Sequence, residues 1–391
     1  MNNRSNENER SGNNIYHWYA DVIVFRGFGP IIACLGIIGG TLSCLVFRRK
    51  ALRKKSCSIY FLFLALADLL VMICWLIHFV LPTYNIQILI LSNFFCKAFV
   101  FAMYLGFDLA NYILTACSID RAVSILFPIG SRQFCRRQVA YTITFVLFII
   151  HTLLNSHIFY GFIVKSANST LNTSIQHCHY RSDSDAYQKF FLAYDSYIEV
   201  IKTNVIPFII MSICNLIIII RVCRSSSSVN LSNGKTNSKT TKSKRKYEKD
   251  RQLTFMLLGS AIAFLVLTLP TEINDIIRSY SSENHVNEKK YLLSAILVSL
   301  AQLNYAIHFY IYTLTGEVFR QQLVKLWPIN IIWPYILRLI QCKNVDSSSL
   351  ATDLTNVNRK RHYEMTQADH TFNPSQLNID IENEDETSHI L

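Results

Sequence analysis

The sequence predicts an all-α membrane protein with seven transmembrane helices and its N-terminus outside. Apolar runs of about twenty residues, the length that crosses a bilayer as a helix, recur along most of the 391-residue chain. Charged residues make up only 16% of the chain, whereas soluble domains carry about 25%. The formal charge of +12 is concentrated in basic runs directly beside apolar runs. The positive-inside rule explains these runs better than nucleic-acid binding does.

The tail at 1–20 is polar and has no apolar signal region, so the first span is expected to direct insertion. Asn3 lies in a glycosylation sequon of this tail. The first span is predicted at 22–47, and the basic run RRKALRKK that follows it marks the cytosolic side. The second span, 57–81, contains Asp68 deep in an apolar run. A carboxylate at this depth usually marks function, with a purely structural aspartate as the alternative.

The third span, 94–127, indicates which membrane face is which. It begins near Cys96 and ends near Asp120 and Arg121. At about 1.5 Å per helical residue it reaches across a hydrocarbon core of about 30 Å. A cysteine that forms a disulfide suits the oxidising side, which leaves Asp120 and Arg121 at the cytosol. The two can form a charge-assisted pair there, or the arginine can simply extend to water.

The fourth span is predicted at 139–164. The outer loop after it carries sequons at Asn168 and Asn172, and also Cys178. Cys96 and Cys178 are the only cysteines that this topology places at or outside the outer surface. We therefore predict a disulfide between them.

The fifth span, 194–223, carries Pro207, which should kink the helix. The segment 224–246 is rich in Ser, Asn, Lys and Thr, and it is expected to be a flexible cytosolic loop. The sixth span, 249–277, contains Pro270.

The seventh span is predicted at 291–314. Its residues Asn304, His308 and Tyr312 are spaced four apart and therefore share one helix face. We see no internal repeat of the kind that marks many transporters.

After Gly316 the sequence EVFRQQLVKLW predicts a short amphipathic helix on the inner leaflet, near the end of a seven-span domain at 21–323. The remaining segment, 324–391, is expected to be a mostly disordered cytoplasmic tail. Cys342 in it is a candidate palmitoylation site. The Ser and Thr content of the tail suits phosphorylation.

The ordered set of these motifs resembles the rhodopsin-like family of G-protein-coupled receptors over about 36–323. The resemblance implies a multi-pass protein of the plasma membrane in which Arg121 engages a heterotrimeric G protein when the sixth span moves outward. It also implies that Asp250, at the cytosolic start of that span, pairs with Arg121 at rest, and that kinases and arrestin act at the cytoplasmic tail. The matching residues are Asp68 in LALADLL, Cys96, Asp120 and Arg121 in SIDRAVSILFP, Cys178, Pro207, Phe264 and Pro270 in FLVLTLP, Tyr312, and Phe319 with Arg320.

The chain departs from the family at several activation motifs. Gly40 replaces an asparagine of the first span, Ala122 follows Asp120 and Arg121, and the fourth span has no tryptophan. Thr268 stands where the family has a switch tryptophan. His308 and Phe309 replace the Asn and Pro of the NPxxY motif, and Asn215 stands where many members carry a tyrosine. None of these changes removes an apolar span, so the fold is expected to persist, with a decoy or constitutively biased receptor as an alternative.

The family's ligand region maps here to Met103, Tyr104, Asp108, Lys202, Glu272, Asp275 and Gln302. Gln302 stands where light-sensing members need a lysine, and Met103 stands where amine receptors carry an aspartate. These exclusions leave a peptide, a lipid or another small molecule as the ligand. The sequence resembles invertebrate neuropeptide receptors of the FMRFamide-related kind, so we expect a peptide. Asp108, Lys202 and Glu272 are expected to lie in one region below the ligand. Glu272, with Asp275, is expected to meet a basic group, and a structural ion pair is the alternative.

The family commonly holds a sodium ion between its second, third and seventh spans. Asp68 and Asn304 match that site here, but Ala110 and His308 replace two of the other polar groups. An imidazole beside a buried carboxylate can supply the compensating charge itself. We therefore expect an Asp68–His308 pair in place of sodium, with a neutral histidine bonded to water as the alternative.

A transporter or channel that uses its intramembrane charges as a pathway is the competing function. An enzyme is disfavoured, because the sequence has no HExxH, phosphate-binding loop or serine elbow. We predict neither a cofactor nor a metal site.

Overall fold

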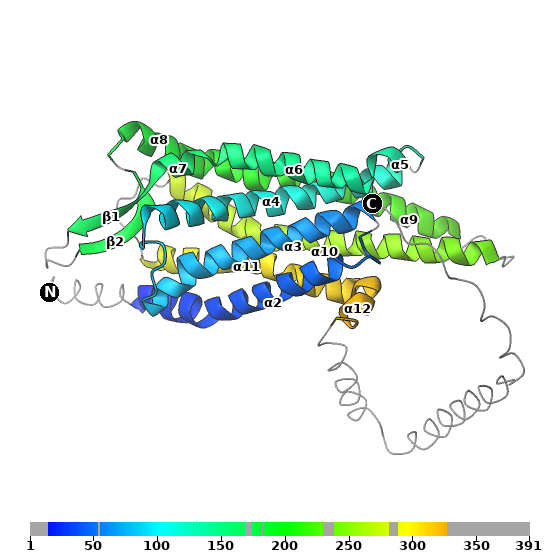
Figure 1. Cartoon of the computed structure of the whole chain (residues 1–391), viewed down its shortest axis with the longest axis horizontal. Coiled ribbons are helices and arrows are strands. Elements are labelled where there is room, and N and C mark those ends of the chain that lie inside the picture. The colour runs from blue at the N-terminus through cyan, green and yellow to red at the C-terminus, as the bar shows by residue number, and fades with distance from the viewer. Residues whose placement is uncertain are drawn as a thin grey trace, which may run out of the picture. The chain divides into compact units, whose positions relative to one another are not determined.

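The computed structural model describes residues 15–53, 55–127, 129–168, 174–181, 183–229, 238–280 and 288–326. The chain divides into two units, Met1–Leu326 and Trp327–Leu391, and all described residues belong to the first. Within the described ranges, seven helices are long and apolar enough to cross a membrane, and they run along one another in a bundle (Figure 1). The predicted seven-span fold is confirmed. The spans are Ile15–Phe47, Ser56–Tyr84, Asn93–Leu126, Arg137–Gly161, Asp185–Arg221, Thr254–Ile277 and Lys289–Thr315.

The first span is π-helical over Tyr19–Phe28 and continues as α2, Gly29–Phe47. Gly40 of α2 packs directly against the second span, since a Cβ added there would lie 2.8 Å from Leu69 Cγ. A glycine at this position therefore allows a closer approach than the asparagine that the family carries. The second span comprises α3, Ser56–Trp75, followed by a π-helical turn at Leu76–Val80 and a 3₁₀ turn at Leu81–Tyr84.

The third span is α4, Asn93–Leu126, and it begins at an N-cap in which the Ser92 side chain accepts a hydrogen bond from the Phe95 backbone N–H. The short helix α5, Ser131–Phe134, follows it. The fourth span consists of α6, Arg137–Leu154, and α7, His157–Gly161.

The prediction of an all-helical chain misses one element, a β-hairpin after α7. Its strands, β1 (Phe162–Asn168) and β2 (Ser174–Tyr180), pair antiparallel with Val164 opposite Cys178. The fourth span was expected to continue to 164, so its last three residues were assigned to the wrong element. These residues, Phe, Ile and Val, favour a strand as soon as a partner strand is present.

The fifth span starts earlier than predicted, at α8, Asp185–Ala193, instead of at 194. The Ser184 side chain caps α8 by accepting a hydrogen bond from the Tyr187 N–H. The span continues through two π-helical segments, Tyr194–Glu199 and Ile201–Val205, into α9, Ile206–Val229.

The sixth span lies in α10, Ser238–Tyr280, the seventh is α11, Glu288–Thr315, and α12, Glu317–Leu323, forms the predicted short helix after Gly316. Part of the segment expected as a flexible loop is helical, because α9 continues to Val229 and α10 already begins at Ser238. Neither extension contains a glycine or proline to end it, whereas Gly234 lies between them, outside the described residues.

The hairpin and α8 lie at one end of the bundle, and α5 and α12 lie at the other end (Figure 1). Near α12, Phe47, Phe61, Tyr312 and Phe319 are buried and stack on one another, which joins α2, α3, α11 and α12. The polar side chains described next are held between these two ends.

Candidate functional site

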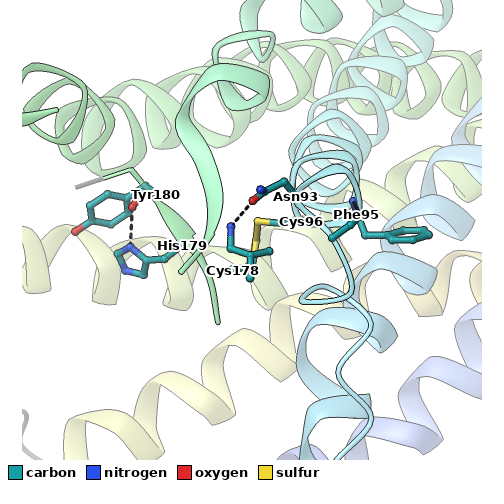
Figure 2. Close-up of a disulfide and its surroundings, with 8 residues drawn as sticks. Asn93, Phe95, Cys96, Cys178, His179 and Tyr180 are labelled. Carbon is teal, nitrogen blue, oxygen red and sulfur yellow. Dashed lines mark hydrogen bonds between the residues drawn. A yellow bond between two sulfur atoms is a disulfide. The ribbon is translucent and has the colours of Figure 1, made fainter. Parts of the chain in front are cut away.

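The β-hairpin is attached to the start of α4 by a disulfide between Cys96 and Cys178 (Figure 2). The Cα atoms of the two cysteines lie 5.5 Å apart. A second contact supports the first, because Asn93 Oδ1 accepts a hydrogen bond from the backbone N–H of Val164 at 2.7 Å. Both strands are therefore tied to α4. The predicted disulfide is present.

A cavity of about 570 Å³ lies between α4, the fifth span, α10 and α11. Its volume is in the range of small-molecule sites. Five of the seven residues that the sequence assigned to the ligand region line it: Met103, Tyr104, Glu272, Asp275 and Gln302. Among the described residues that line the cavity, the other two, Asp108 and Lys202, are not found.

The cavity is acidic. Asp195 and Glu199 line it from the fifth span, and Glu272 and Asp275 line it from α10. Among the described residues that line the cavity there is no lysine or arginine. Asp195 accepts a hydrogen bond from the Tyr104 hydroxyl. The lining therefore brings four carboxylates from two spans around one space.

Asp108 lies behind the cavity wall and is fully buried at 0% exposure. Its carboxylate accepts hydrogen bonds from Lys202 Nζ at 2.8 Å, Asn155 Nδ2 at 2.7 Å and Thr203 Oγ1 at 2.6 Å. His151 Nδ1 lies 3.1 Å from the same carboxylate. This polar cluster thus joins α4, the fourth span and the fifth span.

Lys202 is shared between two acids, because its Nζ also lies 2.7 Å from Glu199 Oε2. The expectation that Asp108, Lys202 and Glu272 share one region is therefore only partly correct. Lys202 pairs with Asp108 and Glu199, whereas Glu272 faces the cavity. Sequence reasoning missed Glu199, although its place three residues before Lys202 was a readable signal.

The fourth span contributes His151 and Asn155, which sequence reasoning also missed. The two are four residues apart and therefore lie on one helix face of an otherwise apolar run. Both are almost fully buried, at 2% and 0% exposure. Paired polar residues on one face of an apolar span would have predicted an interhelical contact.

Pro207 lies at the second residue of α9, just after the π-helical segment Ile201–Val205. Proline has no backbone N–H to donate to the preceding turn. Two carbonyls of that turn accept hydrogen bonds from α4: Asn111 Nδ2 donates to the carbonyl of Thr203, and the Tyr112 hydroxyl donates to that of Lys202, each at 2.9 Å. These two bonds join the fifth span to α4 in the turn just before the proline.

Thr268 lines the cavity, and its hydroxyl donates to the carbonyl of Phe264 one turn below, at 2.6 Å. Phe264 is buried at 2% exposure. Pro270 lies inside α10, two residues after Thr268. A threonine at this point of the lining fills less volume than the tryptophan that stands there in the family the motifs resemble.

Deeper in the bundle, His308 Nδ1 lies 2.8 Å from Asp68 Oδ2, and both residues are 3% exposed. The ring of Tyr312 stacks on His308 with an interplanar angle of 6°. Asn304 is buried as well, but within the described part of the chain its Oδ1 has no hydrogen-bond partner. The imidazole of His308 therefore occupies the position next to the Asp68 carboxylate.

At the α12 end of the bundle, Arg121 forms an ion pair with Asp120 at 2.6 Å, and each is 8% exposed. Ser56, which sequence reasoning missed, donates its hydroxyl to Asp120 at 2.9 Å and accepts from Arg121 at 3.3 Å. Asp250 belongs to α10, but its side chain lies outside the described part of the structure. The proposed contact of Asp250 with Arg121 stays a prediction.

Several predicted modification sites fall outside the described residues, namely Asn3, Asn172 and Cys342. Asn168 is the last residue of β1, and its side chain is likewise outside the described part. Their glycosylation or palmitoylation stays a prediction.

A family model described as "7 transmembrane receptor (rhodopsin family)" matches residues 40–311, which is well over half of the chain. The chain belongs to this receptor family. The receptor is therefore a multi-pass protein of the plasma membrane and not an enzyme. The resemblance inferred from its motifs is confirmed.

The receptor is similar to several curated proteins at low identity. It is 24% identical to cysteinyl leukotriene receptor 1 of Cavia porcellus over 305 residues, 77% of this chain and 83% of the relative. It is 20% identical to G-protein coupled receptor 54 of Oreochromis niloticus over 325 residues, 83% and 84% of the two chains. It is 26% identical to galanin receptor type 2 of Homo sapiens over 116 residues, 30% of each chain.

The predicted topology, with the N-terminus outside, puts the hairpin end of the bundle outward and the end with Arg121 and α12 at the cytoplasm. The acidic cavity is thus on the extracellular side of the receptor, and the Asp108 cluster lies in the wall between its spans.

Proposed function

We propose that this receptor binds an extracellular neuropeptide through a cationic side chain and signals to a heterotrimeric G protein by outward movement of the sixth span. The observation that carries the proposal is the acidic lining of the cavity, in which Asp195, Glu199, Glu272 and Asp275 face one space. Glu199 is already paired with Lys202. Glu272 and Asp275, together on α10, are the carboxylates that we expect a ligand cation to reach.

A peptide fits this site better than a lipid does. The similar receptors include one named for a leukotriene and one named for galanin, so both lipid and peptide ligands occur among them. A peptide can present an arginine, whose planar guanidinium binds carboxylates in a bidentate manner. An arginine-containing peptide of the FMRFamide-related kind meets this requirement.

The signalling route follows the contacts below the cavity. Glu272 follows Thr268 by one turn on α10, and Thr268 is bonded to Phe264 in the buried core. A ligand that draws Glu272 toward itself acts on α10 above Pro270, the residue at which that helix bends most readily. Outward movement of the cytoplasmic half of α10 then opens the surface around Arg121 to the G protein.

The test is a double-mutant cycle in the purified receptor with a purified G protein. Glu272→Gln and wild type are each compared with FMRFamide and with its analogue in which citrulline replaces arginine. A hydrogen-bonded charge pair contributes about 1.5–3 kcal/mol, so Glu272→Gln should lower the potency of FMRFamide by about tenfold or more. The same substitution should change the potency of the citrulline peptide little.

Asp183→Asn is the control, because Asp183 carries a comparable charge near α8 but pairs with Arg181 outside the cavity. It should leave both peptides unaffected. Additive losses in the cycle would contradict a pairing between Glu272 and the arginine. Peptide binding without any nucleotide exchange would instead indicate the decoy receptor, and solute flux into receptor vesicles would indicate the transporter.

A further inference from the structure

The hydroxyl of Thr203, in the wall of the ligand cavity, makes short contacts to two carboxyl groups. Thr203 Oγ1 lies 2.6 Å from Asp108 Oδ1 and 2.8 Å from Glu199 Oε1. Both distances are those of a well-formed O–H···O hydrogen bond. Two acids, one on α4 and one on the fifth span, therefore share a single hydroxyl group.

A hydroxyl carries one proton, so it can donate only one hydrogen bond of this length. If both carboxyl groups were ionised, one of them would face an oxygen lone pair at hydrogen-bond distance, with no proton between the two oxygens. A proton on one carboxyl group removes this conflict, because that group donates to the hydroxyl, which then donates to the other carboxylate. The geometry therefore calls for one proton on either Asp108 or Glu199.

The surroundings of the two acids assign that proton to Glu199. The Asp108 carboxylate also accepts from Lys202 Nζ at 2.8 Å and from Asn155 Nδ2 at 2.7 Å, and such donors stabilise the ionised form. Glu199 Oε2 lies 2.7 Å from Lys202 Nζ, but among the described residues it has no donor with full hydrogen-bond geometry. A protonated Glu199 would donate from Oε1 to Thr203 and keep its carbonyl oxygen, Oε2, toward the lysine.

The charges of the cluster agree with this assignment. One ammonium, that of Lys202, faces the two carboxyl groups of Asp108 and Glu199. Buried charges are costly unless they are balanced. With a proton on Glu199, one carboxylate remains for one ammonium, and the cluster is neutral.

Other titratable groups lie near Glu199 on the elements around it. Of these described groups, His151 is the other possible cation, but its Nδ1 lies 3.1 Å from Asp108 Oδ2 and so its charge would stabilise Asp108. The full set is Tyr104 and Tyr112 on α4, His151 on α6, Tyr194 and Asp195 on the fifth span, Glu272 on α10 and Tyr305 on α11.

We propose that Glu199 is a binding site for one proton, which it shares with Thr203 in the unliganded receptor, and that a cationic ligand expels this proton. Glu199 lines the same space as Glu272 and Asp275, where the ligand cation is expected. A positive charge in that space favours the ionised carboxylate. The O–H bond of the carboxyl group breaks, and its proton passes through the cavity to the extracellular solution.

Proton release also changes the contact between two spans. Once Glu199 is ionised, the Thr203 hydroxyl can donate to only one of its two carboxylate neighbours. Ligand binding thereby acts on a bond between the fifth span and α4, the helix that also carries Arg121. This coupling rests on the proposed cationic ligand, whereas the proton on Glu199 does not.

The proton is tested without ligand, by infrared spectroscopy of the full-length receptor in nanodiscs. A protonated carboxyl group has a C=O stretching band that is separate from the carboxylate bands and that shifts in heavy water. We expect Glu199→Gln to remove one such band at neutral pH. Asp183→Asn is the matched control and should keep it, because Asp183 pairs with Arg181 outside the cavity.

Thr203→Val tests the shared hydrogen bond separately. It keeps Glu199 but removes the hydroxyl, so the frequency of the carboxyl band should change. Thermal unfolding of each variant reports that it is folded. An unchanged band in Thr203→Val would show that the proton is not shared with this hydroxyl.

Proton release is measured by titration calorimetry of FMRFamide in two buffers that differ in ionisation enthalpy. Wild type should release about one proton for each peptide bound, and Glu199→Gln should release none. The analogue with citrulline in place of arginine should release none from either protein. The potency of FMRFamide should rise by up to about tenfold for each unit of increasing pH, because less proton then has to be removed. Glu199→Gln should abolish this slope.

The possible failures are distinct. A carboxyl band that persists in Glu199→Gln would overturn the proton site. Binding of FMRFamide to wild type without proton release would overturn the coupling and leave the proposed ligand intact. A receptor that does not bind FMRFamide would contradict the proposed function and the coupling together, and the infrared band would still decide whether Glu199 holds the proton.

Discussion

At the scale of single residues, the receptor compensates its buried charges with side chains of its own. Asp108 is surrounded by Lys202, Thr203 and Asn155, and Asp68 has His308 at 2.8 Å. A carboxylate buried in a membrane protein is costly unless a cation or several donors face it. Each of these acids therefore depends on particular neighbours, and replacing a neighbour should have a measurable consequence.

The Asp68–His308 contact leads to a prediction about sodium. The imidazole fills the position beside Asp68 that a sodium ion would need, so agonist potency in the wild type should be the same in sodium and in choline buffer. His308→Asn restores the smaller amide of the family motif and should make potency fall as sodium rises. The measurement is a pair of dose–response curves in each buffer.

Phe309→Pro is a suitable control for that experiment, because it restores the neighbouring residue of the same motif while keeping His308. It should not introduce a response to sodium. A strong sodium effect on the wild-type receptor would show that the histidine does not replace the ion.

At the scale of elements, the fifth span is not a uniform helix, because two π-helical segments lie between α8 and α9, just before Pro207. Asn111 and Tyr112 donate to the carbonyls of Thr203 and Lys202 in the turn before the proline, which itself lacks one N–H donor. The contact between α4 and the fifth span therefore depends on backbone carbonyls of the fifth span as well as on side chains.

Asn111→Ala should therefore destabilise the receptor by about 1–3 kcal/mol, the cost of leaving a buried carbonyl without a donor. In a Pro207→Ala background, residue 207 regains an N–H, so Asn111→Ala should cost clearly less. The measurement is thermal unfolding of the four proteins in detergent. Equal costs in both backgrounds would mean that the amide does not compensate for the proline.

At the scale of the whole molecule, the structure separates two polar centres, an extracellular acidic cavity and a cytoplasmic ion pair. At the cytoplasmic end, Ser56 bonds both Asp120 and Arg121 and so holds α3 against α4. The structure therefore holds Arg121 against Asp120 and Ser56 although the third residue of the family's triplet is Ala122.

Ser56→Ala should raise basal nucleotide exchange on the G protein. A hydrogen bond to a charged group contributes about 1.5–3 kcal/mol, and losing one that exists only at rest raises the active fraction by about tenfold or more. Ser58→Ala is the matched control, because Ser58 is buried in the same helix but its Oγ has no hydrogen-bond partner among the described residues. Unchanged basal exchange at equal surface expression would exclude this role for Ser56.

The boundaries of the elements show where sequence reasoning reached its limit. Apolar length identified the seven spans, but it could not separate Phe162–Val164 of the hairpin from the helix before it, because such residues suit either element. It also placed the start of the fifth span nine residues late, at 194 instead of Asp185, although the capping serine Ser184 was visible.

What the sequence by itself determined is the membrane topology, the family and the disulfide. Bilayer thickness fixes the length of a span, the positive-inside rule fixes its direction, and topology then leaves only Cys96 and Cys178 on the outer side. The tertiary structure alone decided which buried charges meet. Lys202 lies one helical turn from Glu199 but is 94 residues from Asp108, and nothing in the chain order showed that it pairs with both rather than with Glu272. Partners of a buried charge are selected by which helix faces come together, and that depends on the packing of all seven spans at once.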